Sequence, residues 1–192
     1  MSCLDSISKN ITSNCTNQPS GGVEVKAWIF SRPTYADAIT FDATHPNKIT
    51  AIASVAGANC YVLTGVKKML NAGHDIVVAD DRADKYTHYF NFQQFEFAAE
   101  DIHNIDNLKD VFVVVERKDK AKDGDGTFVA YGVKNGLWKS TDTRRQNDIN
   151  GARNLELTSM GGHEENFSEY TVLSTDYSTT LSMLEGLETS PA

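Results

Sequence analysis

The chain has 192 residues and a formal net charge of −8, from 18 basic and 26 acidic side chains. This length fits one ordinary domain, or one domain with a long arm, and it is enough to bury a hydrophobic core without disulfide bonds. The hydrophobic fraction of 40% excludes a wholly disordered chain. Proteins that clamp nucleic acid carry a basic stripe, and this sequence has none, so tight binding of DNA or RNA is disfavoured.

The first 22 residues are rich in Ser, Thr, Asn, Pro and Gly and show no hydrophobic period, which predicts an N-terminal arm over 1–22. Residues 23–192 are expected to form a single β-rich domain. Its first strand covers 23–30, until Pro33 ends the run. The next two strands are expected over 37–43 and 47–55, and the Thr-His-Pro-Asn turn between them predicts a hairpin. Two further strands are expected over 59–66 and 74–80.

The longest predicted strand lies within residues 85–99. Aromatic residues and His88 alternate on one face until the register shifts at Phe95, which indicates a bulge or a bend. Residues 98–110 are predicted to form the one clear helix, because Ile, Ile and Leu recur at a spacing of three and acidic residues open the segment.

Strands over 111–117 and 127–138 flank a charged tip and predict a β-hairpin. Residues 140–152 are expected to form a polar loop that is long enough to act at a surface. Two more strands are predicted within 154–167 and 169–176, and 179–187 is either a final helical turn or a docked tail. Eight to ten short strands with one short α-helix indicate a mainly β fold, a β-sandwich or barrel.

The three cysteines, Cys3, Cys15 and Cys60, form neither a disulfide framework nor a CxxC zinc pair. No basic stretch followed by an apolar run opens the sequence, so no signal peptide is predicted. No apolar run reaches the ~20 residues that a membrane helix needs, and no membrane partner is expected. We therefore expect a soluble protein made in a reducing cytoplasm.

Enzyme motifs are absent from the sequence, which has no GxSxG elbow, P-loop, GxGxxG or HExxH. A hairpin turn explains Asp123 and Asp125 better than a calcium loop, which would need a bidentate Glu at its end. The spacings of His74, His88 and His103 fit no metal-ligand pattern, so scattered surface or strand histidines are expected. We predict that the protein is not an enzyme and has no catalytic, cofactor-binding or metal-binding residues.

Three further features have both a functional and a structural interpretation. His163 beside Glu164 and Glu165 looks like an acid–base pair, but its glycine-rich polar context predicts a solvated loop that is not buried. Cys60 lies among apolar residues, which favours a buried thiol over a nucleophile. The aromatic series within 86–97 could stack nucleic-acid bases, but only one Lys is near, so a core and a subunit interface are favoured.

Several segments taken together carry a family resemblance: SGG followed by a strand at 20–30, the turn Gly132–Leu137 of the form G-x-x-N-G-L, and a late strand with a polar, acidic turn at 155–170. In this layout the chain resembles the tail ring and tail-tube-like structural proteins of crAss-like phages, which infect Bacteroidetes. The resemblance covers roughly residues 3–170. It implies a tail-tube-like β-sandwich or barrel that is made in the host bacterial cytoplasm and assembles into a homo-oligomeric ring in the virion tail.

The resemblance also implies a mechanical role as a ring or tube segment that lines a conduit for DNA or protein ejection. Adjacent tail or portal-proximal proteins are the expected partners, and DNA is expected to pass without specific binding because an acidic lumen repels it. Strand edges that are open in one copy would be closed by the next copy. The candidate interface segments are Cys3–Pro19, Lys118–Gly126 and Ser140–Gly151.

Two alternatives remain at the level of sequence. The first is a carbohydrate-binding or adhesion β-sandwich, in which exposed Trp28 and Trp138 line a sugar platform. The second is a small enzyme with an unrecognised site, which requires a pocket of titratable groups with perturbed pKa values.

Overall fold

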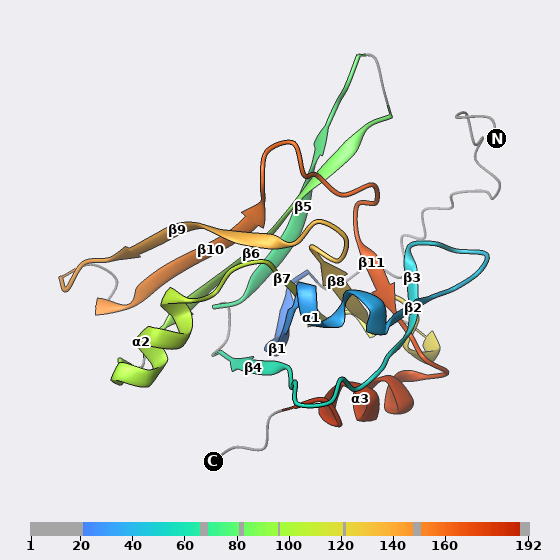
Figure 1. The fold of residues 1–192 in the computed structure, drawn as a ribbon, viewed down its shortest axis with the longest axis horizontal. Coiled ribbons are helices and arrows are strands. Elements are labelled where there is room, and N and C mark those ends of the chain that lie inside the picture. The colour runs from blue at the N-terminus through green and yellow to red at the C-terminus, as the bar shows by residue number, and fades with distance from the viewer. Residues whose placement is uncertain are drawn as a thin grey trace.

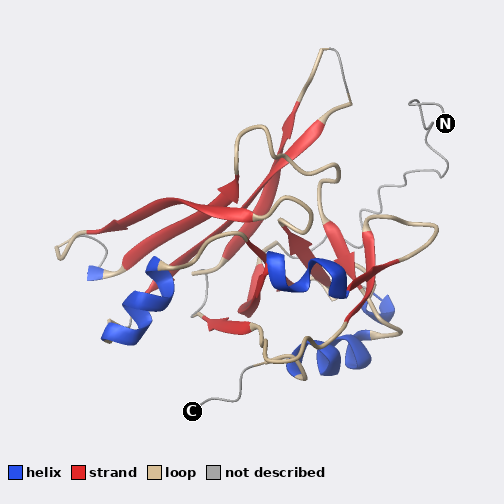
Figure 2. Cartoon of the chain, in the orientation of Figure 1, coloured by secondary structure: helices blue, strands red, loops and turns tan. Residues whose placement is uncertain are grey.

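The computed structural model describes residues 21–65, 69–80, 83–95, 97–120, 122–147 and 151–188. The described residues are mainly β, as the sequence predicts, and include three short α-helices where the sequence predicted one clear helix (Figures 1 and 2). Short 3-10 turns cover Ala36–Ala38 and Lys122–Gly124. The strands and α-helices are, in chain order, β1 (Val23–Ser31), α1 (Arg32–Tyr35), β2 (Ile39–Phe41), β3 (Lys48–Ile52), β4 (Tyr61–Thr64), β5 (Asn71–Val77), β6 (Lys85–Gln94), α2 (Ala99–Asp106), β7 (Val111–Arg117), β8 (Phe128–Tyr131), β9 (Leu137–Arg144), β10 (Arg153–Ser159), β11 (Tyr170–Val172) and α3 (Tyr177–Glu185).

Two layers of strands pack against each other as an open β-sandwich. The first layer has the strand order β2-β3-β11-β8-β7-β1-β4, and the second has the order β9-β10-β6-β5. The layers are joined at one point, where Val111 of β7 pairs with Leu137 of β9. Among the described residues the strand path does not return to its start, so the second of the two predicted architectures, a closed barrel, is not formed.

The central strands β1 and β7 are buried on both sides because alternate residues enter two hydrophobic cores. Trp28 and Phe112 belong to the first core, which α3 covers with Leu184. Ile29 and Val113 belong to the second core, which lies between the two layers and contains residues of β6 and β10. Burial on both faces explains why the sequence of β7 is a continuous apolar run rather than an alternating one.

The helices begin and end where the local chemistry favours it. Pro33 stands in the first turn of α1, which confirms that it ends the first strand. The predicted helix within 98–110 is confirmed as α2. The segment 179–187 forms most of α3, whose N-cap residue Asp176 accepts a hydrogen bond from the backbone N–H of Thr179 at 2.8 Å.

The structure corrects the sequence prediction in two segments, 127–138 and 140–152. Residues 127–138 are not one strand, because the turn between β8 and β9 interrupts them at Gly132 and Gly136, whose φ angles are +76° and +78°. The segment 140–152 is not wholly a loop, because its first five residues continue β9. Residues 141–144 pair with β10, and the register shifts at Ser140. The predicted β2–β3 and β7–β8 hairpins are confirmed as antiparallel pairs.

Strand β6 is confirmed as the longest strand and keeps an unbroken register with both neighbours. Its inward residues His88, Phe90 and Phe92 are buried, as the predicted alternation requires. The strand ends at Gln94, and Phe95 is 49% exposed. The shift in the aromatic pattern therefore marks the end of the strand rather than a bulge inside it.

Candidate functional site

The described residues contain no group of three or more His, Cys, Asp and Glu side chains that could hold a metal ion. His74 and His88 stand opposite each other on β5 and β6, with ring centroids 6.5 Å apart, while His103 lies on α2. Of the three histidines that were considered as metal ligands in the sequence, the structure thus brings His74 and His88 together and leaves His103 apart. The expectation that the protein uses no metal and is not an enzyme stays a prediction.

The His88 side chain is fully buried and has a partner on each ring nitrogen. Nδ1 accepts the backbone N–H of Gly132 at 3.0 Å, so Nε2 carries the proton and donates to the carbonyl oxygen of Phe167 at 2.9 Å. Burial lowers the pKa of His88 from 6.5 to about 4. The imidazole is therefore neutral near pH 7 and links β6 to two loops.

Glu165 is also fully buried, although the sequence predicted a solvated loop here. Its Oε1 accepts the backbone N–H groups of Lys134 and Asn135 at 3.0 and 2.8 Å, and its Oε2 accepts the hydroxyl of Tyr170 at 3.0 Å. Burial raises the pKa of Glu165, and these hydrogen bonds oppose the rise. The prediction was wrong for Glu165 and correct for His163, which is exposed.

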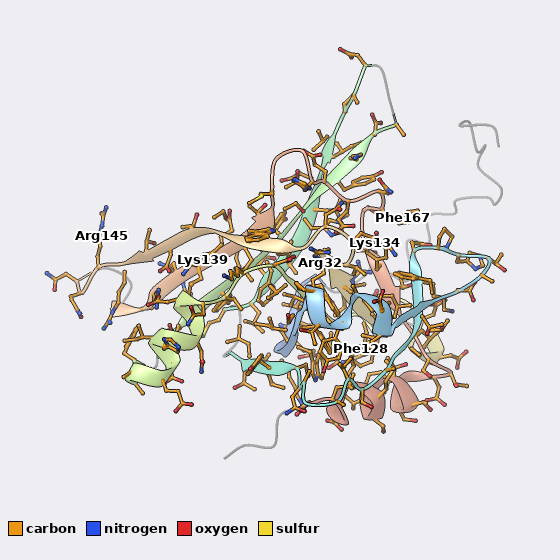
Figure 3. All side chains as sticks on the ribbon, in the orientation of Figure 1. Arg32, Phe128, Lys134, Lys139, Arg145 and Phe167 are labelled. Carbon is orange, nitrogen blue, oxygen red and sulfur yellow. The ribbon has the colours of Figure 1, made fainter. Side chains whose placement is uncertain are left out.

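Together, His88 and Glu165 hold the turn between β8 and β9 against the segment between β10 and β11. We call these two residues the turn clasp. Lys134 in the turn and Phe167 in the segment lie close to each other at this junction (Figure 3). Both side chains of the turn clasp are buried and bonded within the chain, so the arrangement positions a turn and offers no side chain to a substrate.

A bidentate ion pair supports the same junction from the start of α1. The guanidinium of Arg32 donates from Nε to Oδ1 of Asp110 at 2.6 Å and from NH2 to Oδ2 at 2.8 Å. Its NH1 also reaches the carbonyl oxygen of Lys134 at 3.3 Å. Such planar pairs fix geometry as well as charge, so Arg32 ties the turn to the first layer.

Burial excludes one of the two tryptophans from the sugar platform of the sequence-level alternative. Trp28 is fully buried in the first core, and its Nε1 donates to Oε1 of Glu188 at 2.8 Å. Trp138, on β9, is partly exposed. Cys60 is fully buried, which confirms the structural interpretation, and burial raises the pKa of its thiol to about 12.

The three predicted interface segments differ in how far the structure leaves them available to a neighbouring chain. Cys3–Pro19 lies outside the described residues. In Lys118–Gly126, Gly124 packs against the backbone of Tyr177, and Asp125 lies 3.9 Å from Nζ of Lys48, so this tip contacts its own chain. The first half of Ser140–Gly151 is an edge strand, which makes it the segment most available to a neighbour.

The second layer has two open edges. β5 ends the strand order on one side, and β9 is paired beyond β10 only through Leu137. The hairpins β5–β6 and β9–β10 extend away from the body of the molecule in different directions (Figure 1). Ile76 at the end of β5 is 55% exposed and Val78 just after it is 70% exposed. Exposed apolar residues on an open edge are a site for pairing with another chain.

Comparison with known proteins gives no matching family model, no matching curated protein and no matching solved structure. In the described part of the chain, no helix combines the length and the apolar character needed to cross a membrane. The best candidate for a functional site is the pair of open edges of the second layer.

Proposed function

We propose that the chain is a structural subunit of a homo-oligomeric ring or tube, and that this ring is a segment of a phage tail. The observation that carries the proposal is that β5 and β9 are the two open edges of one four-stranded sheet. Exposed edges of this kind are normally covered, shortened or charged in a protein that stays monomeric. In a ring of identical copies both edges are closed, because β9 of each copy pairs with β5 of the next copy and β5 of each copy pairs with β9 of the copy before it.

Strand direction supports a ring in particular. Each strand of the second layer is antiparallel to its neighbour in the sheet, so β5 and β9, at the two ends of the four-strand order, run in opposite directions. In a ring with rotational symmetry all copies have the same orientation along the axis. β9 of one copy then meets β5 of the next as an antiparallel pair, which is the more stable ladder.

The net charge supports a conduit through which DNA passes. With −8 per copy, a ring of identical subunits multiplies the negative charge and repels phosphate over distances near the Debye length, about 8 Å at physiological salt. DNA would therefore slide through the lumen without specific binding, and adjacent tail or portal-proximal proteins would stack on the two ends of the ring.

The test is the oligomeric state of the full chain, measured by size-exclusion chromatography with light scattering and by negative-stain imaging. We expect closed rings, and we expect Ile76→Lys on β5 to shift the chain toward the monomer because a charge on an edge opposes strand pairing. Tyr61→Lys is the matched control, since Tyr61 is 63% exposed on β4, an edge of the other layer. A stable monomer at high concentration, without rings, would count against the proposal.

A further inference from the structure

A pocket of about 270 Å³ lies on the outer face of the second layer, which is the face turned away from the core. It extends across all four strands, because residues of its lining stand opposite one another in register. These residues, on β5, β6, β10 and β9, are Asn71, Asn91, Glu156 and Thr141. The pocket therefore belongs to the face of the sheet and not to either open edge.

The polar groups of this pocket are mainly neutral. Gln93 and Asn154 add two more amides to those of Asn71 and Asn91. Glu156 is the one charged side chain among the described residues that line the pocket, and its Oε1 already accepts the hydroxyl of Ser140 at 2.9 Å. Amide and hydroxyl groups both donate and accept hydrogen bonds, so this lining suits a neutral ligand rich in hydroxyl groups better than an anion.

One residue that lines the pocket carries an acceptor without a donor. The side-chain oxygen Oδ1 of Asn91 is buried and has no hydrogen-bond partner among the residues that the structure describes. Buried polar atoms of native proteins are nearly always paired, and each exception calls for an explanation. A ligand hydroxyl in the pocket supplies the missing donor once the Asn91 side chain turns this oxygen toward the pocket.

Aromatic rings lie on the same face, next to the row of amides. Tyr89 and Trp138 both stand opposite Thr158, two residues along the sheet from Asn91 and Glu156. The ring of Tyr89 lies over Gly73, where an added Cβ would be 2.5 Å from the Tyr89 hydroxyl. Both aromatic residues are partly exposed. The apolar C–H face of a sugar ring packs on such surfaces, while its hydroxyl groups reach the amides.

We propose that the outer face of the second layer binds a neutral oligosaccharide, with Asn91 accepting a hydrogen bond from a sugar hydroxyl. Trp28, which the sequence suggested for this purpose, has no part in the site. The inference goes beyond the proposed ring and does not depend on it, because the pocket is complete within one copy.

The experiment is isothermal titration calorimetry of the full chain with maltohexaose, cellohexaose and chitohexaose, and with a heparin hexasaccharide as the anionic comparison. We expect at least one neutral probe to bind with a Kd on the order of 1 mM or tighter. Asn91→Ala is expected to weaken this binding about three- to tenfold, the effect of one hydrogen bond. Gln146→Ala, which removes an exposed amide beyond the end of β9, is expected to leave the Kd unchanged.

Three outcomes would overturn the proposal. In the first, no neutral probe binds with a Kd below about 10 mM. In the second, heparin hexasaccharide binds more tightly than every neutral probe. In the third, Asn91→Ala folds, as judged by circular dichroism, and keeps the wild-type Kd. Light scattering on the same samples reports the oligomeric state separately, so a failed ring and a failed sugar site are distinguishable.

Discussion

Glu165 gives the sharpest test of the turn clasp, through a comparison of Glu165→Ala with Glu165→Gln. Alanine leaves three donors without an acceptor, namely the N–H groups of Lys134 and Asn135 and the hydroxyl of Tyr170. A buried donor without a partner costs about 1–3 kcal/mol, so we expect a loss of about 3 kcal/mol or more. Typical domains have only about 5–15 kcal/mol of stability.

Glutamine is expected to cost about 1 kcal/mol, because its side-chain oxygen still accepts both backbone N–H groups and its amide can donate to Tyr170. The assay is urea unfolding followed by circular dichroism at one fixed protein concentration, since assembly makes apparent stability depend on concentration. Glu185→Ala, at an exposed site, should change stability by less than about 0.5 kcal/mol. Equal losses for alanine and glutamine would refute the reasoning.

Three further predictions follow from the described geometry. The pKa of His88 is about 4 in the folded chain, and its ordinary value of 6.5 applies to the unfolded chain. The unfolded chain therefore binds the proton more readily, and the free energy of unfolding should fall by up to about 3 kcal/mol as the pH drops from 6.5 to 4. The raised pKa of Glu165 makes the folded chain more stable as the pH falls, so Glu165 cannot cause this loss. His88→Gln should therefore abolish the loss of stability between pH 6.5 and 4 in urea titrations, and an unchanged dependence of stability on pH would contradict the assignment to His88. Gly132→Ala should cost about 2 kcal/mol or more and Gly126→Ala about 1 in thermal unfolding, since both have positive φ but only the first brings Cβ to 2.5 Å from Leu137; equal losses would argue against the clash. Cys60 should resist iodoacetamide at about pH 8 until the protein unfolds, as peptide mapping by mass spectrometry can show, and rapid labelling of the native chain would contradict its burial.

The strands that pack on a core could be predicted from the sequence because their residues alternate or form apolar runs. β6 shows the alternation on one face, and β7 shows the unbroken run of a strand buried on both sides. These are local signals, and a single sequence carries them. The turn Gly132–Gly136 entered the sequence analysis only through the family resemblance, because the local pattern of residues 127–138 indicated one strand, although both glycines take positive φ angles.

The edge strand and the buried carboxylate could not be predicted, for two physical reasons. β9 is exposed along most of its length, so Ser140–Arg144 has the polar composition of a loop. Glu165 is buried by partners about thirty residues earlier in the chain, and nothing in the local pattern indicates them. The pocket around Asn91 depends on the register of four strands, which becomes visible only once they are paired.

Because β7 is buried on both faces, the two hydrophobic cores depend on each other for their stability. Residues of this strand contribute in turn to each core, so neither layer can separate without exposing the apolar surface that stabilises the other. Local opening should therefore be confined to the outer hairpins, and the molecule should melt in one cooperative step. In native-state hydrogen exchange, the amides of Val113, Val114 and Val115 should be the last to exchange with solvent.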